Sequence, residues 1–457
     1  MLKENVNKSN SMELFHSAPP AQAVLKNALP AMVAMLMVLV YNLADTFFIG
    51  QTHDDLQVAA VSLATPVFLI FMALGTVFGV GGTSVISRAL GQRRPHYAKR
   101  VCAFCMWACV AVGVVMSALM LIFMEPLLRL IGASPETWAL TKTYLVIVTC
   151  SGPFVLIANC FSNILRAEGE ANRAMLGQLL GNLLNIVLDP IMILGLGWGI
   201  TGAAVATVIG VLFSAAYYIV YFLRGQSSLS ISPRLATLRQ GVCTSVLAIG
   251  IPAALGSLLM SVSQIIVNAQ MAGYDDMALA GIGVAMKVTM ITGMLCIGFG
   301  QGVQPLLGYC VGARLWPRFK EIMKISLIFA LGLSLLLTAA CYLLRRQIVS
   351  VVLTEPAAFD YALQFTNILL TTSFLFGIFY VLVNALQAMG AASAALIINL
   401  SRQGLIYIPA LFILQAMLGM TGLVWAQPLA DLLSTALVCP LYWLTLRRLM
   451  QTAPHTN

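Results

Sequence analysis

Five ionisable side chains lie well inside long apolar stretches of the chain: Asp45, Asp189, Lys287, Arg402 and Asp431. Placing a charged side chain at the middle of a membrane costs roughly 2.5–3.5 kcal/mol of free energy on insertion scales. Such residues are therefore found there only where they are paired with another group or have a function. Two carboxylates that share a poorly hydrated pocket cannot both ionise cheaply, so such a pair exchanges a proton or binds Na⁺ through its oxygens. These residues therefore indicate ion exchange within a membrane.

Asp45 and Asp189 occupy matching positions in two predicted helices, at residues 22–49 and 170–193. Both helices are expected to run outward, and each carboxylate lies about twenty residues along its helix. The two side chains should therefore lie at a similar depth in the outer half of the membrane.

Asn185 and Thr207 are expected to join these two carboxylates. Asn185 lies one turn before Asp189 on the same helical face, and Thr207 enters from the outside on the next predicted helix. The four residues could converge on one coupling cation, either H⁺ or Na⁺, and no other metal site is expected. The structural alternative is that Asp45 is an interfacial residue near a helix end and that Asp189 merely precedes the kink-forming Pro190.

Lys287, Arg402 and Asp431 also lie at matching depths, each about ten residues into its predicted helix. Lys287 and Arg402 are candidates for lining a substrate cavity. The alternative is a structural Arg402–Asp431 ion pair, which would leave Lys287 as the freer group facing the cavity.

The elements that carry these residues must be membrane helices. Hydrophobic residues make up 60% of the 457 positions and charged residues only 9%, against roughly 25% charged residues in soluble domains. Several stretches free of Asp, Glu, Lys and Arg exceed the ~20 residues that a spanning helix needs. They lack the alternation of a barrel strand, so the fold class is an all-α membrane protein.

Glycines, prolines and charge clusters divide the apolar stretches into twelve predicted transmembrane helices. Their ranges are 22–49, 56–86, 98–123, 139–161, 170–193, 200–223, 243–270, 277–308, 320–343, 360–386, 391–415 and 420–446. If both termini are cytoplasmic, most Lys and Arg residues fall in cytoplasmic segments, as the positive-inside rule requires. The external exceptions are Arg129, Lys142, Arg345 and Arg346.

An internal repeat appears when the sequence is shifted by about 221 residues. The glycine-rich segment that begins at Gly79 then falls on the one that begins at Gly300, and Pro135 falls on Pro356. The repeat predicts two six-helix lobes related by a pseudo-two-fold axis along the membrane normal, with the substrate path between them. A channel is the alternative, but channels commonly place one pore on the axis of an oligomer.

The predicted domains follow from this repeat. They are an N-terminal cytoplasmic tail at 1–21, an N-lobe at 22–224, a cytoplasmic inter-lobe linker at 225–242, a C-lobe at 243–446 and a cytoplasmic tail at 447–457. The N-terminal stretch shows no cleavable signal pattern, so we expect it to be retained.

Several other functions are disfavoured. The sequence has no GxxxxGK[ST] phosphate loop, and its histidines lie in tails or loops, so no enzyme activity and no cofactor are expected. The CxxC pair Cys102 and Cys105 has no second pair or histidine beside it, which disfavours a zinc site. The excess of Lys and Arg follows membrane topology, so no nucleic-acid partner is expected. The glycine pair Gly177 and Gly181 has a GxxxG spacing that predicts close helix packing.

Taken together, the residues resemble the multidrug and toxic compound extrusion (MATE) family, DinF-like branch, over essentially the whole chain. The resemblance is carried by Pro30, Asp45, Asn159, Asn163, Asn185, Asp189 and Thr207. It implies an outward-facing V of two lobes and efflux of amphipathic, often cationic compounds by proton or sodium antiport. By the family pattern, Asp45, Asn185, Asp189 and Thr207 carry the cation. Pro30 bends the first helix, and Asn159 and Asn163 line the N-lobe cavity.

The sequence departs from some members of this family in its second half, where Gln264, Asn268 and Gln270 stand in place of an acidic cation site. No ion site is therefore expected in the C-lobe. The 23 methionines and 21 phenylalanines would suit an adaptable pocket for varied substrates.

The main alternative is a lipid or lipid-linked oligosaccharide flippase of the same superfamily, which should line its cavity with several basic groups. The expected partners are drug-like small molecules and the lipid bilayer. The expected location is the bacterial inner membrane, with the protein as a monomer.

Overall fold

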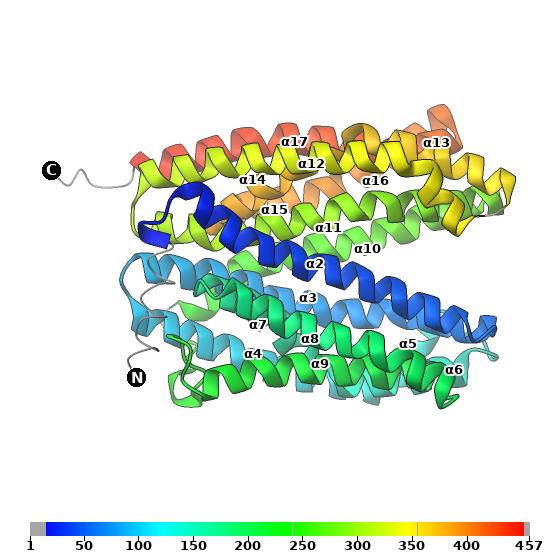
Figure 1. The fold of residues 1–457 in the computed structure, drawn as a ribbon, viewed down its shortest axis with the longest axis horizontal. Coiled ribbons are helices and arrows are strands. Elements are labelled where there is room, and N and C mark those ends of the chain that lie inside the picture. Colours follow the sequence, from blue (N-terminus) through cyan, green and yellow to red (C-terminus); the bar gives the residue numbers. More distant parts are fainter. Residues whose placement is uncertain (1–14, 240, 354, 452–457) are drawn as a thin grey trace. The chain divides into compact units, whose positions relative to one another are not determined.

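The structure is a computed structural model that describes residues 15–239, 241–353 and 355–451. Every regular element within these ranges is a helix (Figure 1). This confirms the predicted all-α fold class. The remaining parts of the two predicted tails, 1–14 and 452–457, lie outside the described residues.

The helices of the first half follow one another with short connections. They are α2 (Pro20–Gly50), α3 (Asp55–Gly91), α4 (Pro95–Ile122), α5 (Met124–Leu130), α6 (Trp138–Cys150), α7 (Gly152–Ala167), α8 (Ala171–Asp189), the π-helix η1 (Pro190–Gly195) and α9 (Gly199–Leu223).

The second half repeats this pattern with similar lengths. Its helices are the short η2 (Pro233–Leu235), α10 (Val242–Ala272), α11 (Asp276–Gly312), α12 (Trp316–Val352), α13 (Pro356–Ser373), α14 (Phe376–Ala388), α15 (Ala392–Leu400), the π-helix η3 (Ser401–Leu405), α16 (Tyr407–Leu418) and α17 (Met420–Gln451).

Within the described residues, ten helices are long and apolar enough to cross a membrane, and up to twelve spans result if each bent pair counts as one. The bent pairs are α6 with α7, at 54°, and α13 with α14, at 48°. They fall on the predicted spans 139–161 and 360–386, so the fourth span of each half is broken. The chain is therefore a multi-pass membrane protein.

The chain forms two compact units, each made of two separate stretches of the sequence. The first unit contains Val33–Gly250 and the described residues before Ala18, and the second contains Ala18–Met32 and Ile251 onward. The predicted lobes, 22–224 and 243–446, are each one continuous stretch of sequence. The two compact units are not, because α2 and α10 are each divided between them.

Close contacts explain why the first part of α2 belongs to the second unit. The Asn27 Nδ2 atom donates to the Gly302 carbonyl at 2.8 Å. A Cβ added to Gly302 would lie only 2.4 Å from the Ala28 Cα. In the same way, a Cβ added to Gly250 would lie 1.9 Å from the Val77 carbonyl oxygen, which places the start of α10 in the first unit.

The segment between α9 and α10, predicted as a linker at 225–242, is held against the first unit. The buried Glu168 carboxylate accepts hydrogen bonds from the Ser227 hydroxyl, at 2.6 Å, and from the Ser228 amide. The Trp107 indole N–H donates to the Ile231 carbonyl at 3.1 Å. This segment therefore runs over α4 and the end of α7.

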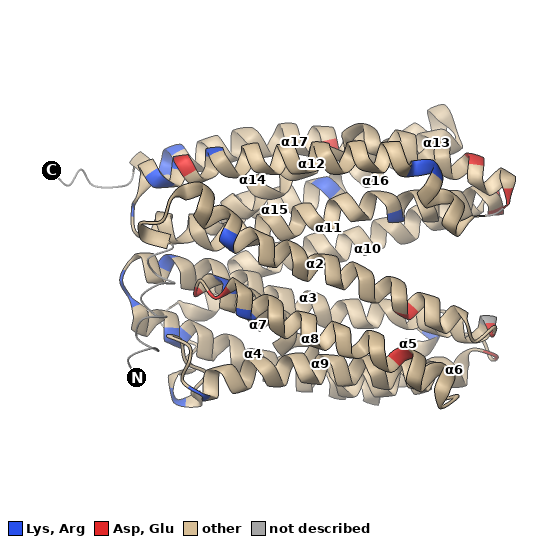
Figure 2. Cartoon of the chain, viewed as in Figure 1, with Lys and Arg blue, Asp and Glu red and all other residues tan. Residues whose placement is uncertain are grey.

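Charges are unevenly distributed along the helices. In each unit, Lys and Arg gather at one end of the helices, and the spans between the ends carry few charges (Figure 2). The connection from α3 to α4 carries Arg93 and Arg94, and the connection from α11 to α12 carries Arg314. This is the distribution that the positive-inside rule describes.

Candidate ion site and buried ion pair

Asp189 lies where α8 changes into the π-helix η1, and its side chain is fully buried. The next residue, Pro190, has no amide hydrogen to continue the α-helical ladder. Short π-helical turns inside α-helices occur frequently at functional sites, where they redirect side chains.

Asn185 connects Asp189 to the neighbouring helix. Its Nδ2 atom lies 3.4 Å from Asp189 Oδ1 and 3.5 Å from Thr207 Oγ1 on α9. Both distances exceed the usual 2.7–3.2 Å range for N–H···O hydrogen bonds. The three predicted residues are therefore adjacent but loosely bonded to one another.

The packing of α8 on α9 places Thr207 beside Asn185. Ser214 Oγ donates to the Gly177 carbonyl at 2.9 Å, and Tyr218 OH donates to the Ala174 carbonyl at 2.7 Å. A Cβ at Gly181 would lie 1.9 Å from Ser214 Oγ. The predicted close packing at this glycine pair is present, and it requires the absence of a side chain.

Asp45 joins this group from α2. Its side chain is half-buried, and it lies near enough to Asp189 for the two charges to interact. The hydroxyl groups of Tyr41 and Tyr144 lie within electrostatic reach of both carboxylates. The structure thus brings all four predicted ion-site residues together within the first unit.

Three oxygen atoms of this site are buried without a hydrogen-bond partner among the described residues: Asp45 Oδ1, Asn185 Oδ1 and Asp189 Oδ2. Buried polar atoms are rarely left unpaired, so an unpaired set marks a candidate binding site. Carboxylate and amide oxygens suit a proton or a hard cation such as Na⁺. In the described part of the chain, no three His, Cys, Asp or Glu side chains form a group that could hold a metal ion.

Sequence reasoning missed two further polar residues of α8, Gln178 and Asn182. Gln178 Oε1 and Asn182 Nδ2 are also buried and unpaired among the described residues. With Asn185 and Asp189 they follow the three- and four-residue spacing of one helical face. That spacing was visible in the sequence and could have identified them.

Asn159 and Asn163, the predicted cavity residues, are engaged in contacts of α7. Asn159 Nδ2 donates to the Met72 carbonyl on α3 at 3.0 Å, and Asn163 Nδ2 donates to the Asn159 carbonyl at 2.9 Å. The Asn163 side-chain oxygen accepts from Arg166 Nη1 at 3.1 Å. The Asn159 amide therefore ties α7 to α3, whereas these Asn163 contacts lie within α7. The role of both residues in lining a cavity stays a prediction.

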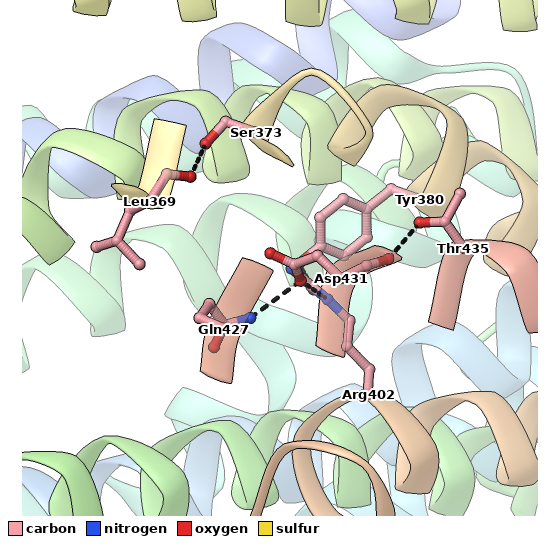
Figure 3. Close-up of polar contacts among 7 residues, drawn as sticks. All are labelled: Leu369, Ser373, Tyr380, Arg402, Gln427, Asp431 and Thr435. Atoms are coloured by element: carbon pink, nitrogen blue, oxygen red, sulfur yellow. Dashed lines mark hydrogen bonds and ion pairs between the residues drawn. The ribbon is translucent and has the colours of Figure 1, made fainter. Parts of the chain in front are cut away.

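In the second unit, Arg402 and Asp431 form a buried ion pair (Figure 3). Arg402 Nε donates to Asp431 Oδ1 at 2.9 Å, and Gln427 Nε2 donates to the same oxygen at 2.9 Å. Arg402 Nη1 donates to Tyr380 OH at 2.7 Å. This is the pairing that the structural alternative predicted, and Tyr380 is a partner that the sequence did not indicate.

The π-helix η3 positions Arg402. It places Ser401, Arg402 and Gln403 in the interior, and the Ser263 hydroxyl of α10 donates to the Gln403 carbonyl at 2.6 Å. Arg402 also lines a pocket within the second unit. Lys287 is exposed on α11 and is not among the residues that line this pocket, so its predicted cavity role stays untested.

Comparison with known proteins agrees with this geometry. The family model MatE matches residues 30–191 and again residues 252–413, so the same pattern occurs in both halves. The chain is 32% identical over 425 residues to the multidrug export protein MepA of Staphylococcus aureus (strain NCTC 8325 / PS 47), covering 93% of this chain and 94% of that protein. It is 31% identical over 432 residues to MepA of Staphylococcus haemolyticus (strain JCSC1435), covering 93% of each.

A solved structure described as the outward-facing conformation of a multidrug resistance MATE family transporter of the MOP superfamily has the same fold. Its TM-score is 0.91 at 24% identity, over 96% of this chain and 98% of that chain. Because the family model matches both halves and the relatives cover nearly the whole length, the chain belongs to the MatE family, the multidrug and toxic compound extrusion family that its sequence resembles.

Proposed function

We propose that this protein is a secondary active multidrug efflux antiporter that exports amphipathic, often cationic organic compounds in exchange for H⁺ or Na⁺. The names of the relatives support the export of several drugs. The ion site of the first unit supports coupling to a cation.

The observation that carries the proposal is the set of three unpaired, buried oxygens on Asp45, Asn185 and Asp189. No basic side chain forms a hydrogen bond or ion pair with either carboxylate among the described residues. An unpaired buried charge is costly, so the carboxylates are stabilised when they bind a proton or a cation. A site of this kind alternates between loaded and empty states, as antiport requires.

The same proposal places the protein in the bacterial inner membrane as a monomer, with both termini in the cytoplasm. The gathering of Lys and Arg at one end of the helices supports that orientation. Assignment to the DinF-like branch rests on the residue pattern of Asn185, Asp189 and Thr207.

The lipid flippase alternative is less well supported. A cavity for a lipid-linked pyrophosphate would need basic groups free to bind it, and Lys287 and Arg402 are the candidates. Arg402 is already ion-paired with Asp431, and Lys287 is exposed outside the second-unit pocket.

Everted membrane vesicles test the proposal directly. Uptake of a fluorescent cationic dye is followed while the pH gradient and the Na⁺ gradient are imposed separately. We expect uptake to require one of the two gradients, because only the loaded site can complete the exchange. A preparation without the protein gives the background.

Uptake that proceeds equally without either gradient would contradict antiport. Uptake driven by one gradient alone identifies the coupling ion.

A further inference from the structure

The second unit contains a pocket that is separate from the ion site. Its volume is about 170 Å³, and it is formed by α10, α11, α13, α14, η3, α16 and α17. Three methionines, Met286, Met290 and Met294, follow one face of α11, and Met260 faces them from α10. Met260 and Gln264 are exposed, so the pocket is open on the α10 side.

The surface of this pocket is soft and largely apolar. Methionine side chains adapt to varied shapes, and their sulfur atoms make favourable contacts with aromatic rings. Phe376 and Tyr380 add aromatic surface from α14. An engineered apolar cavity of about 150 Å³ in another protein is large enough to bind benzene, so this pocket has the volume for a small ring system.

Arg402 is the only charged residue among those that line the pocket in the described part of the chain. Its charge is balanced by Asp431, at 2.9 Å, and its guanidinium lies over the rings of Phe376, Phe379 and Tyr380. The pocket therefore has no net charge, unlike the ion site with its two carboxylates.

The pair nevertheless leaves hydrogen-bond donors available. Arg402 Nε donates to Asp431 and Nη1 donates to Tyr380, whereas Nη2 has no hydrogen-bond partner among the described residues. A ligand atom that accepts a hydrogen bond can use Nη2 without disturbing the ion pair. A cationic ligand would lie beside a guanidinium, and an anionic one would compete with the buried Asp431 carboxylate.

We propose that this pocket of the second unit binds an uncharged aromatic ring system that carries a hydrogen-bond acceptor, with the ring among the methionines and the acceptor on Arg402 Nη2. The open α10 side allows the ring to be part of a larger molecule. The inference rests on the proposed function in one respect, because it treats such a molecule as transported cargo. Binding to the pocket can be measured without transport.

Three compounds of nearly equal shape separate ring, acceptor and charge. Naphthalene has no acceptor, quinoline has one and is uncharged at neutral pH, and N-methylquinolinium carries a permanent positive charge. Each is titrated into the purified full-length protein in detergent by calorimetry. Quinoline should bind a few-fold, about fivefold, more tightly than naphthalene because of one additional hydrogen bond. N-methylquinolinium has no acceptor either, because the methyl group takes the nitrogen lone pair, so naphthalene is its matched comparison. It should bind about tenfold or more weakly than naphthalene because its charge must be desolvated.

Gly293→Leu tests the location. A Cβ at Gly293 would meet the Phe376 ring at 3.9 Å, which is ordinary contact, so the longer side chain fills the pocket without a backbone clash. The matched control is Gly283→Leu on the same helix, where a Cβ meets nothing within 4 Å and which does not line the pocket. Quinoline binding should be lost in the first variant and retained in the second, and the heat that remains in the first variant measures partition into detergent. If Gly293→Leu fails to fold, Met290→Trp fills the same space.

The double variant Arg402→Leu/Asp431→Leu tests the acceptor contact. It should remove the preference for quinoline over naphthalene while both rings still bind. Equal quinoline binding by wild type, Gly293→Leu and Met290→Trp would overturn the proposed site, and so would tighter binding of N-methylquinolinium than of naphthalene. If vesicles show no gradient-driven efflux but quinoline still binds in the pocket, the proposed function fails and the site stands.

Discussion

Asp45 carries one of the two carboxylates of the proposed coupling site and joins it from α2, whereas Asp189 lies at the end of α8. Asp45→Asn keeps the size and hydrogen-bonding shape of the side chain but removes the titratable charge. We expect gradient-driven efflux to fall to background in everted vesicles while the melting temperature of the purified protein changes little.

The matched control is Asp360→Asn, the same chemical change at an exposed carboxylate of α13. It should export at the wild-type rate. Export by Asp45→Asn at that rate would mean that the cluster of the first unit is structural.

Asp431 should behave differently, because its partner Arg402 is also buried. Asp431→Asn leaves the guanidinium without a counter-charge, and breaking a buried ion pair in this way costs about 3–5 kcal/mol. We expect a clear loss of melting temperature and expression.

The double variant Arg402→Leu/Asp431→Leu should recover most of that stability, because replacing a buried pair by apolar residues is often neutral or stabilising. Thermal unfolding of the single and double variants, followed side by side, checks this. A double variant as unstable as Asp431→Asn would show that the loss does not come from the unpaired arginine.

At the level of elements, the contact between α8 and α9 determines where Thr207 lies. Gly181→Ala would place its Cβ 1.9 Å from Ser214 Oγ, where it also displaces the Ser214 hydrogen bond to Gly177. Overpacking of this kind costs about 1–3 kcal/mol. We expect lower thermal stability together with weaker ion coupling, because α9 must move away from Asn185.

Gly332→Ala on α12 is the control, since a Cβ there meets nothing within 4 Å. We expect this variant to have the melting temperature of the wild type, and its efflux should depend on the driving ion in the same way. If the Gly181→Ala protein is destabilised but its ion coupling is unchanged, the packing of α8 on α9 does not control the ion site.

At the scale of the whole molecule, α2 and α10 each belong partly to both units, and each division falls within one turn of a proline, Pro30 or Pro252. A proline inside a helix removes one backbone hydrogen bond and allows a bend. We therefore expect Pro30→Ala to slow transport while ion affinity stays nearly unchanged. Efflux rate and ion dependence, measured on one vesicle preparation, distinguish the two effects. Wild-type turnover would show that the proline is dispensable.

The orientation is a second prediction for the whole molecule. With both termini in the cytoplasm, a C-terminal green fluorescent protein fusion should fluoresce and a C-terminal alkaline phosphatase fusion should be inactive. A phosphatase fusion within the segment after α2, near His53, should be active. The reverse pattern would contradict the cytoplasmic placement of Arg93, Arg94 and Arg314.

Much of the candidate site could be predicted because each of its charged residues is conspicuous in the sequence by itself. Asp45 and Asp189 are rare charges in apolar stretches, and a helical period places Asn185 on the face of Asp189. Gln178 and Asn182 follow the same period and were overlooked only because uncharged amides are less conspicuous than carboxylates. The pairing of Arg402 with Asp431 was one of the two predicted alternatives, but its second partner, Tyr380, was not predicted. Tyr380 lies on α14, in another span, and no local spacing relates it to Arg402.

The amino-acid sequence by itself determined the fold class and the repeat, and it named the four residues that the structure brings together in the candidate ion site. Hydropathy and helical period depend on residues that are near one another in the sequence, so both can be evaluated without knowledge of the fold. Only the tertiary structure decided which helices approach closely enough to pair their side chains. It assigned the start of α2 to the second unit through Asn27 and Gly302, and it joined Asn159 to α3. Such contacts depend on the close approach of two backbones where a glycine has no Cβ, and they join residues that lie 275 positions apart for Asn27 and Gly302 and 87 apart for Asn159 and Met72.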